Sequence, residues 1–171
     1  MKNIILVGMP GCGKTTVAKE LVSLLFGVIA VDIDEEIVKS EKRTINDIFE
    51  KDGEEYFREL ETEILKKYQN TNNLIISTGG GIVERDENIE LMKQIGLVFY
   101  LYSDINTLYE RVKSDSSRPL LKVENVKERL EMLYNRRDKK YRRADFIIDT
   151  TNLTPNETAR SIIKESGYDR N

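Results

Sequence analysis

Residues Gly8 to Thr15 combine glycines, a lysine and a threonine in the spacing G-x-x-x-x-G-K-[ST]. Such a loop lets consecutive backbone N–H groups converge on phosphate oxygens, while the lysine adds a positive charge. An apolar run, Ile4 to Val7, precedes the motif, and a helical pattern from Thr16 to Phe26 follows it. Because strand, loop and helix are the context in which this motif binds phosphate, the sequence predicts a nucleotide-phosphate site. Its expected residues are Gly11, Cys12, Gly13, Lys14, Thr15 and Thr16.

Two carboxylates follow as Asp32-Ile33-Asp34 at the end of the next apolar run. Side chains two apart on a strand point to the same side, so both carboxylates are expected to face the cleft above the glycine loop. Thr15 and Asp32 then supply oxygen ligands of the kind that Mg²⁺ prefers, and Asp34 remains to accept protons from substrate hydroxyls. For either aspartate taken alone, capping of a helix N-terminus is the competing interpretation.

A second glycine cluster, Gly79-Gly80-Gly81, follows Ser77-Thr78. Three consecutive glycines indicate a place where the backbone approaches a ligand or another chain segment closely, although a tight turn is the alternative. Ser77 stands where many phosphate-loop proteins carry an acidic metal ligand, so the metal is expected to depend on Thr15, Asp32, water and the phosphates.

Three arginines are candidates for binding anions. Arg58 and Arg137 lie on charged helical stretches, where a solvated side chain is the more common outcome. Arginine nevertheless holds a carboxylate through two parallel hydrogen bonds, which lysine cannot do. Arg118 precedes Pro119 in a polar, irregular region, 114–125, which we interpret as a lid whose arginine stabilises the transferring phosphoryl group. An ordinary surface loop is the alternative for this region.

Apolar runs alternate with helical stretches, which predicts an α/β three-layer sandwich with a five-stranded parallel sheet. A long helical excursion, about 34–68 and broken near Asp52-Gly53, separates the second strand from the third; such excursions at the carboxyl ends of parallel strands build ligand sites. The whole chain, 1–171, is expected to form a single domain. The predicted strands read as runs buried on both faces: Asn3 to Val7, Val28 to Ile33, Leu74 to Ser77, Leu97 to Leu101 and Asp145 to Asp149.

The composition sets limits on partners and compartment. With 33% charged residues and a net charge of −3, the chain shows no electrostatic footprint for nucleic acid or an anionic membrane. No apolar run reaches the length of a membrane span, and there is one cysteine, so we expect a cytoplasmic protein and, at 171 residues, a monomer. Histidine is absent, which excludes imidazole from proton transfer and from metal binding.

The ordered set of motifs resembles the shikimate kinase family over nearly the whole chain. Five features distinguish this family from others with the same phosphate loop: Asp32-Ile33-Asp34, Asp-Gly-Glu-x-x-Phe-Arg ending at Arg58, the glycines at 79–81, Arg118-Pro119-Leu120-Leu121, and Arg137-x-x-x-Tyr141-x-x-x-Asp145.

The resemblance implies a P-loop kinase fold and transfer of the γ-phosphoryl of ATP to the 3-hydroxyl of shikimate, with Mg²⁺ as cofactor. It also implies roles for residues. Arg58, Arg137 and the backbone of Gly79, Gly80 and Gly81 would hold the shikimate carboxylate, and Asp34 would bind ring hydroxyls. Lys14 and Arg118 would contact the transferring phosphate, and Arg111 would lie near the adenine. Around Asn152 the chain lacks an arginine that members of the family can carry near the adenine.

Two other functions remain open at this point. One is a P-loop kinase of another small hydroxy acid such as gluconate, or of a nucleoside monophosphate; loss of Arg58 and Arg137 would favour it, and both are present. The other is a non-catalytic nucleotide-binding regulatory module, in which Lys14, Asp34 or Arg118 would be expected to be eroded; none is. For Cys12 we hypothesise that alkylation inactivates the protein and that MgATP slows the reaction, whereas a small, buried and inert sulfur is the alternative.

Overall fold

The computed structural model describes residues 1–113 and 124–168. Five strands of this part of the chain form one parallel sheet in the order β2-β3-β1-β4-β5. The predicted α/β fold with a five-stranded parallel sheet is confirmed. The predicted lid, with Arg118, lies outside the described residues except for its last two positions.

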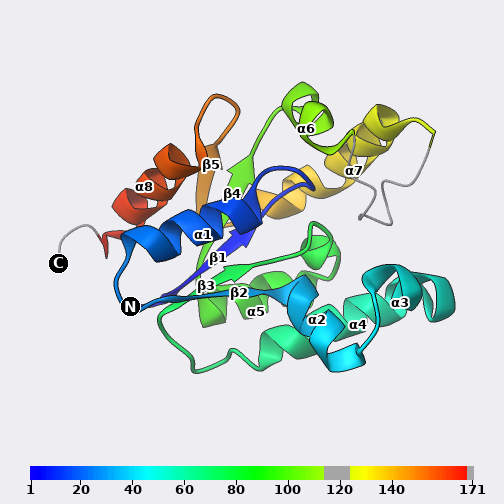
Figure 1. Cartoon of the computed structure of the whole chain (residues 1–171), viewed down its shortest axis with the longest axis horizontal. Coiled ribbons are helices and arrows are strands. Elements are labelled where there is room, and N and C mark those ends of the chain that lie inside the picture. The colour runs from blue at the N-terminus through cyan, green and yellow to red at the C-terminus, as the bar shows by residue number, and fades with distance from the viewer. Residues whose placement is uncertain (114–123, 169–171) are drawn as a thin grey trace.

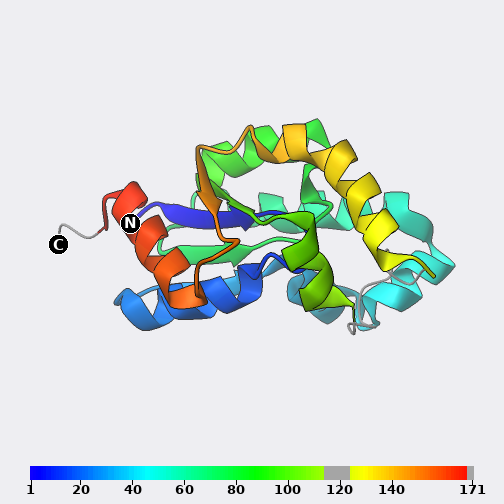
Figure 2. The same ribbon diagram turned by 90° about the horizontal axis from the view of Figure 1, so that it is seen from above.

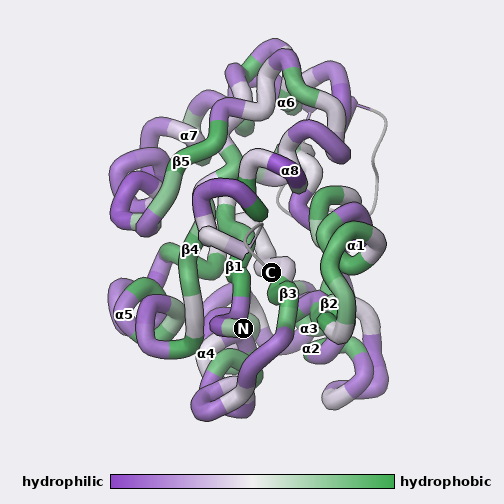
Figure 3. Tube along the Cα trace, turned by 90° about the vertical axis from the view of Figure 1, so that its left-hand side faces the viewer, coloured by the Kyte–Doolittle hydropathy of each residue, from purple (hydrophilic) through white to green (hydrophobic). Residues whose placement is uncertain are grey.

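The centre of the sheet is β1 (Asn3–Val7), in which every residue is buried. It lies between β3 (Leu74–Ser77) and β4 (Gly96–Tyr102), and Figure 3 shows β1 and β4 as hydrophobic segments in the middle of the molecule. Because both faces of these strands are covered, their sequences are nearly continuous apolar runs. This part of the core is what the sequence predicted.

The two edge strands differ from the prediction. β2 (Ile29–Asp32) and β5 (Phe146–Asp149) each pair with one neighbour, and Ile29 and Ile147 are exposed. The expectation that all strands are buried on both faces was therefore wrong for β2 and β5. A strand at the edge of a sheet has a neighbouring strand on one side only and is less completely covered, so a run of apolar residues does not by itself indicate burial of both faces.

Helices cover both faces of the sheet, as Figure 2 shows. On one face, α1 (Lys14–Leu24) packs against α8 (Pro155–Ser166). On the other face lie α5 (Asp86–Ile95), in contact with β4, and α7 (Val126–Tyr141), whose Tyr141 stacks on Tyr100 of β4 with ring centroids 4.9 Å apart. The helix α6 (Ile105–Val112) contacts α7. Three layers result, as predicted.

The excursion between β2 and β3 consists of α2 (Ile33–Glu41), α3 (Ile45–Lys51) and α4 (Gly53–Lys66). Figure 1 shows α2 and α3 past the end of β2, on the side of the sheet where the loop between β1 and α1 also lies. The chain breaks at Asp52, as predicted, and also before Thr44, whose hydroxyl caps α3 by accepting a hydrogen bond from the Asp47 N–H. A Thr cap starts a new helix because it satisfies an N–H that the helix itself leaves unpaired.

Candidate active site

The glycine loop turns sharply out of β1 and delivers the chain to the N-terminus of α1. Gly13 precedes α1 in a left-handed conformation (φ 94°), and no side chain caps the first turn. The helix α2, in contrast, is capped by Asp32. An uncapped N-terminus leaves N–H groups free to bind an anion, and the aligned peptide dipoles favour negative charge at that end.

Lys14 is the first residue of α1, and its side chain is buried against the loop. Its ammonium donates hydrogen bonds to the carbonyl oxygens of Gly8 (2.7 Å) and Met9 (3.1 Å). The Lys14 ammonium also lies 3.6 Å from the Cys12 sulfur. The Lys14 ammonium therefore lies against the backbone of the loop, next to the expected phosphate position.

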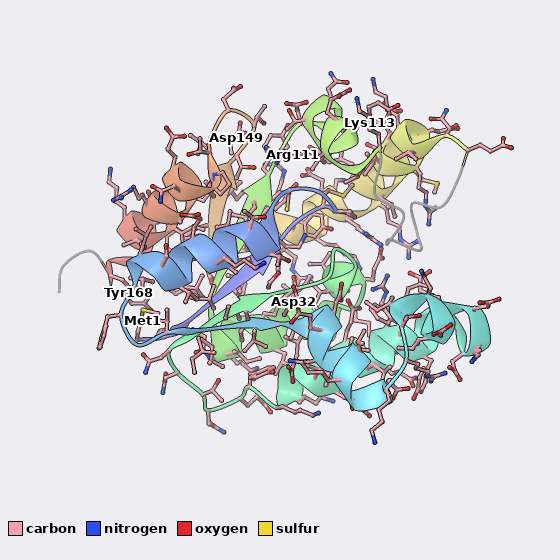
Figure 4. All side chains as sticks on the ribbon, in the orientation of Figure 1. Met1, Asp32, Arg111, Lys113, Asp149 and Tyr168 are labelled. Carbon is pink, nitrogen blue, oxygen red and sulfur yellow. The ribbon has the colours of Figure 1, made fainter. Side chains whose placement is uncertain are left out.

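A cavity of about 430 Å³ opens over this loop. Arg111 of α6 reaches it from the other side, with its Nη1 donating to the Gly11 carbonyl (3.3 Å) and lying 3.4 Å from the Ser103 hydroxyl. Figure 4 shows Arg111 above the loop and Asp32 where β2 meets α2. All the predicted phosphate-loop residues line this cavity, which is bounded by Gly11, Cys12, Gly13, Lys14, Thr15, Thr16, Val17, Asp32, Asp34, Thr78, Gly79, Arg111, Thr150, Leu153, Pro155 and Thr158.

Thr15 and Asp32 come together through the sheet. The Thr15 hydroxyl donates to Asp32 Oδ2 (3.0 Å) and lies 3.4 Å from the Ser77 hydroxyl. Asp32 and Ser77 are register partners on β2 and β3, which explains why the two side chains reach the same point. Hydroxyl and carboxylate oxygens are ligands that Mg²⁺ accepts while it keeps several waters, so the residues present fit such an ion. Among the described residues no cluster of three acidic, cysteine or histidine side chains forms a closed metal site.

Asp34 reaches the cleft in a different way from the one predicted. The strand β2 ends at Asp32, and Ile33 already begins α2, so the expectation that both aspartates point the same way along a strand was wrong. Asp32 caps α2 instead: its Oδ1 accepts hydrogen bonds from the N–H groups of Asp34 (3.0 Å) and Glu35 (3.3 Å). Asp34 then faces the cleft from the first turn of the helix, where the helix dipole favours a carboxylate.

A second cavity, of about 510 Å³, adjoins the first. Phe49 of α3 and Phe57 of α4 form an apolar part of its wall, with ring centroids 4.9 Å apart. Arginines from two distant helices add positive charge. The residues that line this cavity are Pro10, Thr15, Asp32, Asp34, Glu35, Val38, Thr44, Ile45, Asn46, Phe49, Phe57, Arg58, Glu61, Gly79, Gly80, Gly81 and Arg137.

Arg58 and Arg137 are buried, against the usual tendency of arginine on a charged helix. Arg58 donates to Glu61 Oε2 (2.7 Å) and to Glu54 Oε1 (2.9 Å), both on α4. The side chain of Arg137 is 1% exposed and donates through Nε to Glu84 Oε1 (2.6 Å), whereas that of its neighbour Arg136 is 58% exposed. Of this adjacent pair, the structure therefore brings Arg137 into the cavity and leaves Arg136 at the surface.

The glycines after β3 are required by close packing. A Cβ atom at Gly79 would lie 2.8 Å from Asp34 Oδ1 and 2.9 Å from Glu61 Oε1, and one at Gly81 would overlap the Arg58 guanidinium. The Gly80 carbonyl accepts a short hydrogen bond from the hydroxyl of buried Tyr141 on α7. The three glycines thus let the backbone run past the charged groups of the second cavity.

Glu61 is fully buried beside the carboxylate of Asp34. Burial raises the pKa of Glu61 to about 7, and Asp34 adds to this shift, although the nearby Arg58 charge acts in the opposite direction. Its Oε1 has no hydrogen-bond partner, while Oε2 holds Arg58. The second cavity thus contains a carboxyl group whose pKa lies near neutral pH.

Sequence reasoning missed Glu61 and Glu84. The spacing Arg58-Glu59-Leu60-Glu61 offered a signal for Glu61, because residues three apart on a helix are neighbours. For Glu84 no local signal existed, since its partners lie on α7, far along the chain.

Similarity to known proteins identifies the family to which this chain belongs. The model of the shikimate kinase family matches residues 10–166. The chain belongs to the shikimate kinase family. Proteins named shikimate kinase from Thermodesulfovibrio yellowstonii and Persephonella marina are 46% and 44% identical to it over 170 and 163 residues. They cover 99% and 95% of this chain, and the matches span 96% and 98% of those proteins.

Solved structures of shikimate kinases have the same fold. The enzyme from Acinetobacter baumannii, determined in complex with shikimate, matches with a TM-score of 0.94 and 38% identity, covering 99% of this chain and 95% of that one. The enzyme from Aquifex aeolicus matches with a TM-score of 0.83 and 35% identity, covering 98% and 97%. Membership of this family confirms the predicted activity, which is phosphoryl transfer from ATP to shikimate.

Arg118 lies outside the residues that the structure describes, so its expected contact with phosphate stays a prediction.

In the ranges 1–113 and 124–168, none of the helices has the length and apolar character needed to cross a lipid bilayer.

Proposed function

We propose that the shikimate kinase reaction of this chain takes place where the two cavities meet. The observation that carries the proposal is that Thr15, Asp32, Asp34 and Gly79 line both cavities. A nucleotide whose phosphates lie over the glycine loop would direct its γ-phosphoryl group toward a ring hydroxyl held in the second cavity. Such positioning is the main requirement of phosphoryl transfer, which has a loose transition state and needs little covalent assistance.

Arg58 and Arg137 are proposed to bind the shikimate carboxylate together with the backbone of Gly80. Both guanidinium groups line the second cavity, each with a buried nitrogen that makes no hydrogen bond, Nε of Arg58 and Nη2 of Arg137. Buried donors that lack an acceptor are costly to leave unsatisfied, and a carboxylate ligand would supply acceptors. The apolar wall of Phe49 and Phe57 would pack against the ring of the substrate.

Asp34 is proposed to orient the 3-hydroxyl and to accept its proton as the oxygen attacks the γ-phosphorus. The bond between that phosphorus and the oxygen of ADP breaks, and the leaving group departs as ADP. Lys14 would stabilise the charge that develops on the phosphoryl oxygens. Arg118 is proposed to add a second positive charge from the lid, about 114–125, which would also keep water away from the γ-phosphate.

Thr15 and Asp32 are proposed to hold Mg²⁺, directly or through water. The fit of their oxygens, 3.0 Å apart, supports this proposal. When bound, the ion would screen the phosphate charge and orient the β- and γ-phosphates. Asp32 would have to serve this role while its other oxygen caps α2, so its position is fixed before any ligand arrives.

Arg111 and the wall formed by Thr150, Leu153 and Pro155 are proposed to hold the adenosine end of ATP. We further propose a single kinase domain over 1–171 that works as a cytoplasmic monomer, with the small molecule shikimate as its partner and without a nucleic acid or membrane partner. The net charge of −3 supports the proposal that neither a nucleic acid nor an anionic membrane is a partner.

A coupled assay of ADP release with shikimate, quinate and gluconate tested side by side examines the substrate assignment. We expect turnover with shikimate and at least about 100-fold lower kcat/KM with gluconate, which lacks the ring that the apolar wall would contact. Turnover confined to quinate or gluconate would overturn the assignment and favour a kinase of another hydroxy acid. ATP binding without turnover of any of the three would favour a regulatory module.

A further inference from the structure

Glu84 is an acidic residue that links the segment after the glycines at 79–81 to α7. It ends the short 3₁₀ helix η1 (Ile82–Glu84), directly after the glycines at 79–81. Its carboxylate accepts hydrogen bonds from Arg137 Nε (2.6 Å) and Arg136 Nε (3.0 Å), and its carbonyl oxygen accepts one from Lys140 Nζ (2.9 Å). One residue thus contacts three cationic side chains on consecutive turns of α7.

The contact with Arg137 determines which edge of the guanidinium remains available. A guanidinium carries five N–H donors in one plane. Glu84 occupies the Nε edge, whereas Nη2 is buried and has no hydrogen-bond partner. Arg137 also lines the cavity in which its ligand is proposed to lie. Fixing one edge of a rigid planar group fixes the direction of the other donors.

The charges show why such a partner is needed. Arg137 is almost completely buried, and an isolated buried charge is strongly unfavourable unless it is paired. Glu84, itself 9% exposed, supplies the counter-charge. Burial works against the ionised form of this carboxyl, but the hydrogen bond and charge of Arg137 lower the pKa of Glu84 overall. Glu84 therefore stays ionised, and Arg137 stays paired, across the neutral pH range.

We propose that Glu84 is a positioning residue for substrate binding: it fixes Arg137 so that the Nη2 edge is presented to the carboxylate of the acidic substrate. The proposal rests on the proposed role of Arg137 as a carboxylate ligand. Glu84 does not touch the nucleotide cavity, so its contribution is confined to affinity for the acid. Its own negative charge works against a second carboxylate, and the orienting hydrogen bond outweighs that repulsion.

The substitutions Glu84→Ala and Glu84→Gln separate the contribution of the hydrogen bond to Arg137 from that of the negative charge of Glu84. Alanine removes the acceptor, so the KM for shikimate is expected to rise by about tenfold or more, as for loss of a hydrogen bond to a charged group. The KM for ATP and kcat are expected to stay within about twofold. Glutamine keeps an oxygen that can accept from Arg137 Nε, so Glu84→Gln is expected to restore the KM for shikimate to within about threefold of the wild type.

Asp86→Ala is the matched control. Asp86 is an exposed acid two residues further on, and it also links to α7, through Arg143 (3.1 Å) and Lys140 (3.6 Å), but not through Arg137. If Glu84 acted only by docking α7, both alanine variants would change kinetics and melting temperature together. We expect the Asp86 variant to leave the KM for shikimate unchanged.

A shikimate analogue with a neutral carboxamide in place of the carboxylate makes the test specific. With this analogue, the rise in KM caused by Glu84→Ala is expected to shrink to less than about twofold, because the proposed contact of Arg137 is with the carboxylate.

Should Glu84→Ala fail to fold, Glu84→Asp takes its place. Aspartate keeps the charge but its shorter side chain draws the oxygens away from Arg137, so a several-fold rise in the KM for shikimate is expected.

An unchanged KM for shikimate in Glu84→Ala, or in Glu84→Asp if that is the folded variant, would overturn the proposal. Equal penalties with shikimate and with its carboxamide would do so as well. Failure of the proposed role of Arg137 has a different signature, because Arg137→Lys would then leave the KM for shikimate unchanged as well.

Discussion

The two cavities of this kinase are built in opposite ways. The proposed nucleotide cavity takes seven of its lining residues from one contiguous segment, Gly11 to Val17, and the cation of that segment, Lys14, donates to carbonyl oxygens of the same loop. The second cavity takes its cations from α4 and α7, and each is held by a carboxylate, Glu61 for Arg58 and Glu84 for Arg137.

This difference separates two ways of recognising an anion. Backbone N–H groups at a helix N-terminus carry partial charges that are fixed by the fold and need no counter-ion. Buried arginines need partners before a ligand arrives, because the desolvation of an unpaired charge is unfavourable. In the proposed function, phosphate is therefore bound mainly by backbone N–H groups together with Lys14, whereas the acid is bound by arginines that pre-formed ion pairs orient.

The largest effect is expected at the nucleotide cavity. Replacement of Lys14 by alanine removes the only side-chain cation of the phosphate loop, and kcat is expected to fall by about 10³-fold, the scale seen when a group that stabilises transition-state charge is lost. The measurement is steady-state kinetics with shikimate and MgATP. Lys19→Ala, an exposed lysine on the same helix, is the control. A decrease of less than tenfold for Lys14→Ala would contradict this role.

At the second cavity the effect should appear in binding of the acid. Arg137→Lys keeps the charge but loses the planar fork, so the KM for shikimate is expected to rise by about 10- to 100-fold while the KM for ATP changes little. The adjacent Arg136→Lys, at an exposed position, is the matched control and should change neither constant by more than about twofold. Equal effects of the two substitutions would refute the proposed role of Arg137 in binding the substrate carboxylate.

The same contrast explains what could be predicted from the sequence. The glycine loop, β1 and α1 are consecutive in the chain, so a local pattern determines both their structure and their chemistry, and Gly11 to Thr16 do line one cavity. Arg58 and Arg137 were found through family motifs. Taken alone, their helical, highly charged surroundings favoured a solvated side chain, which is the opposite of their burial.

What could not be predicted depends on contacts between distant segments. Glu84 pairs with residues more than fifty positions away, and nothing in its neighbourhood indicates this. Asp34 was predicted to face the cleft, but by strand geometry, whereas Asp32 ends the strand by capping α2. The open sides of β2 and β5 follow from strand order, which apolar runs do not encode.

A smaller effect, which distinguishes the carboxylates that hold the two arginines, Glu61 for Arg58 and Glu84 for Arg137, should appear in the pH dependence of stability. The pKa of Glu61 is about 7 in the folded protein, above its ordinary value of 4.5, so the folded state binds the proton more tightly than the unfolded state. The stability contributed by this group is complete below about pH 4.5 and is lost as pH rises to about 7. Glutamine does not titrate, so the free energy of unfolding of the wild type relative to Glu61→Gln should fall by at most about 1.4 kcal/mol per pH unit between pH 5 and 7.

Glu84→Gln provides the comparison for that titration, because the pKa of Glu84 is lowered and its contribution is lost only as pH falls below its ordinary range. Urea unfolding at pH 5, 6, 7 and 8 should therefore show a constant difference between the wild type and Glu84→Gln. Parallel curves for the wild type and Glu61→Gln over the same range would show that Glu61 does not titrate there.

The smallest effect is expected for alkylation of Cys12, whose thiol lines the cavity over the glycine loop. Its side chain is 2% exposed, and its sulfur lies 3.6 Å from the Lys14 ammonium. Burial means that iodoacetamide reacts only when the loop opens, so alkylation should be slow. MgATP at ten times its dissociation constant should slow it further by about tenfold, because bound nucleotide reduces the open population in proportion to occupancy. Cys12→Ser should keep most of the activity and lose sensitivity to the reagent. Equal alkylation rates with and without MgATP would mean that the reagent reaches the sulfur by a path that nucleotide does not close, which would contradict the hypothesis that bound nucleotide shields Cys12.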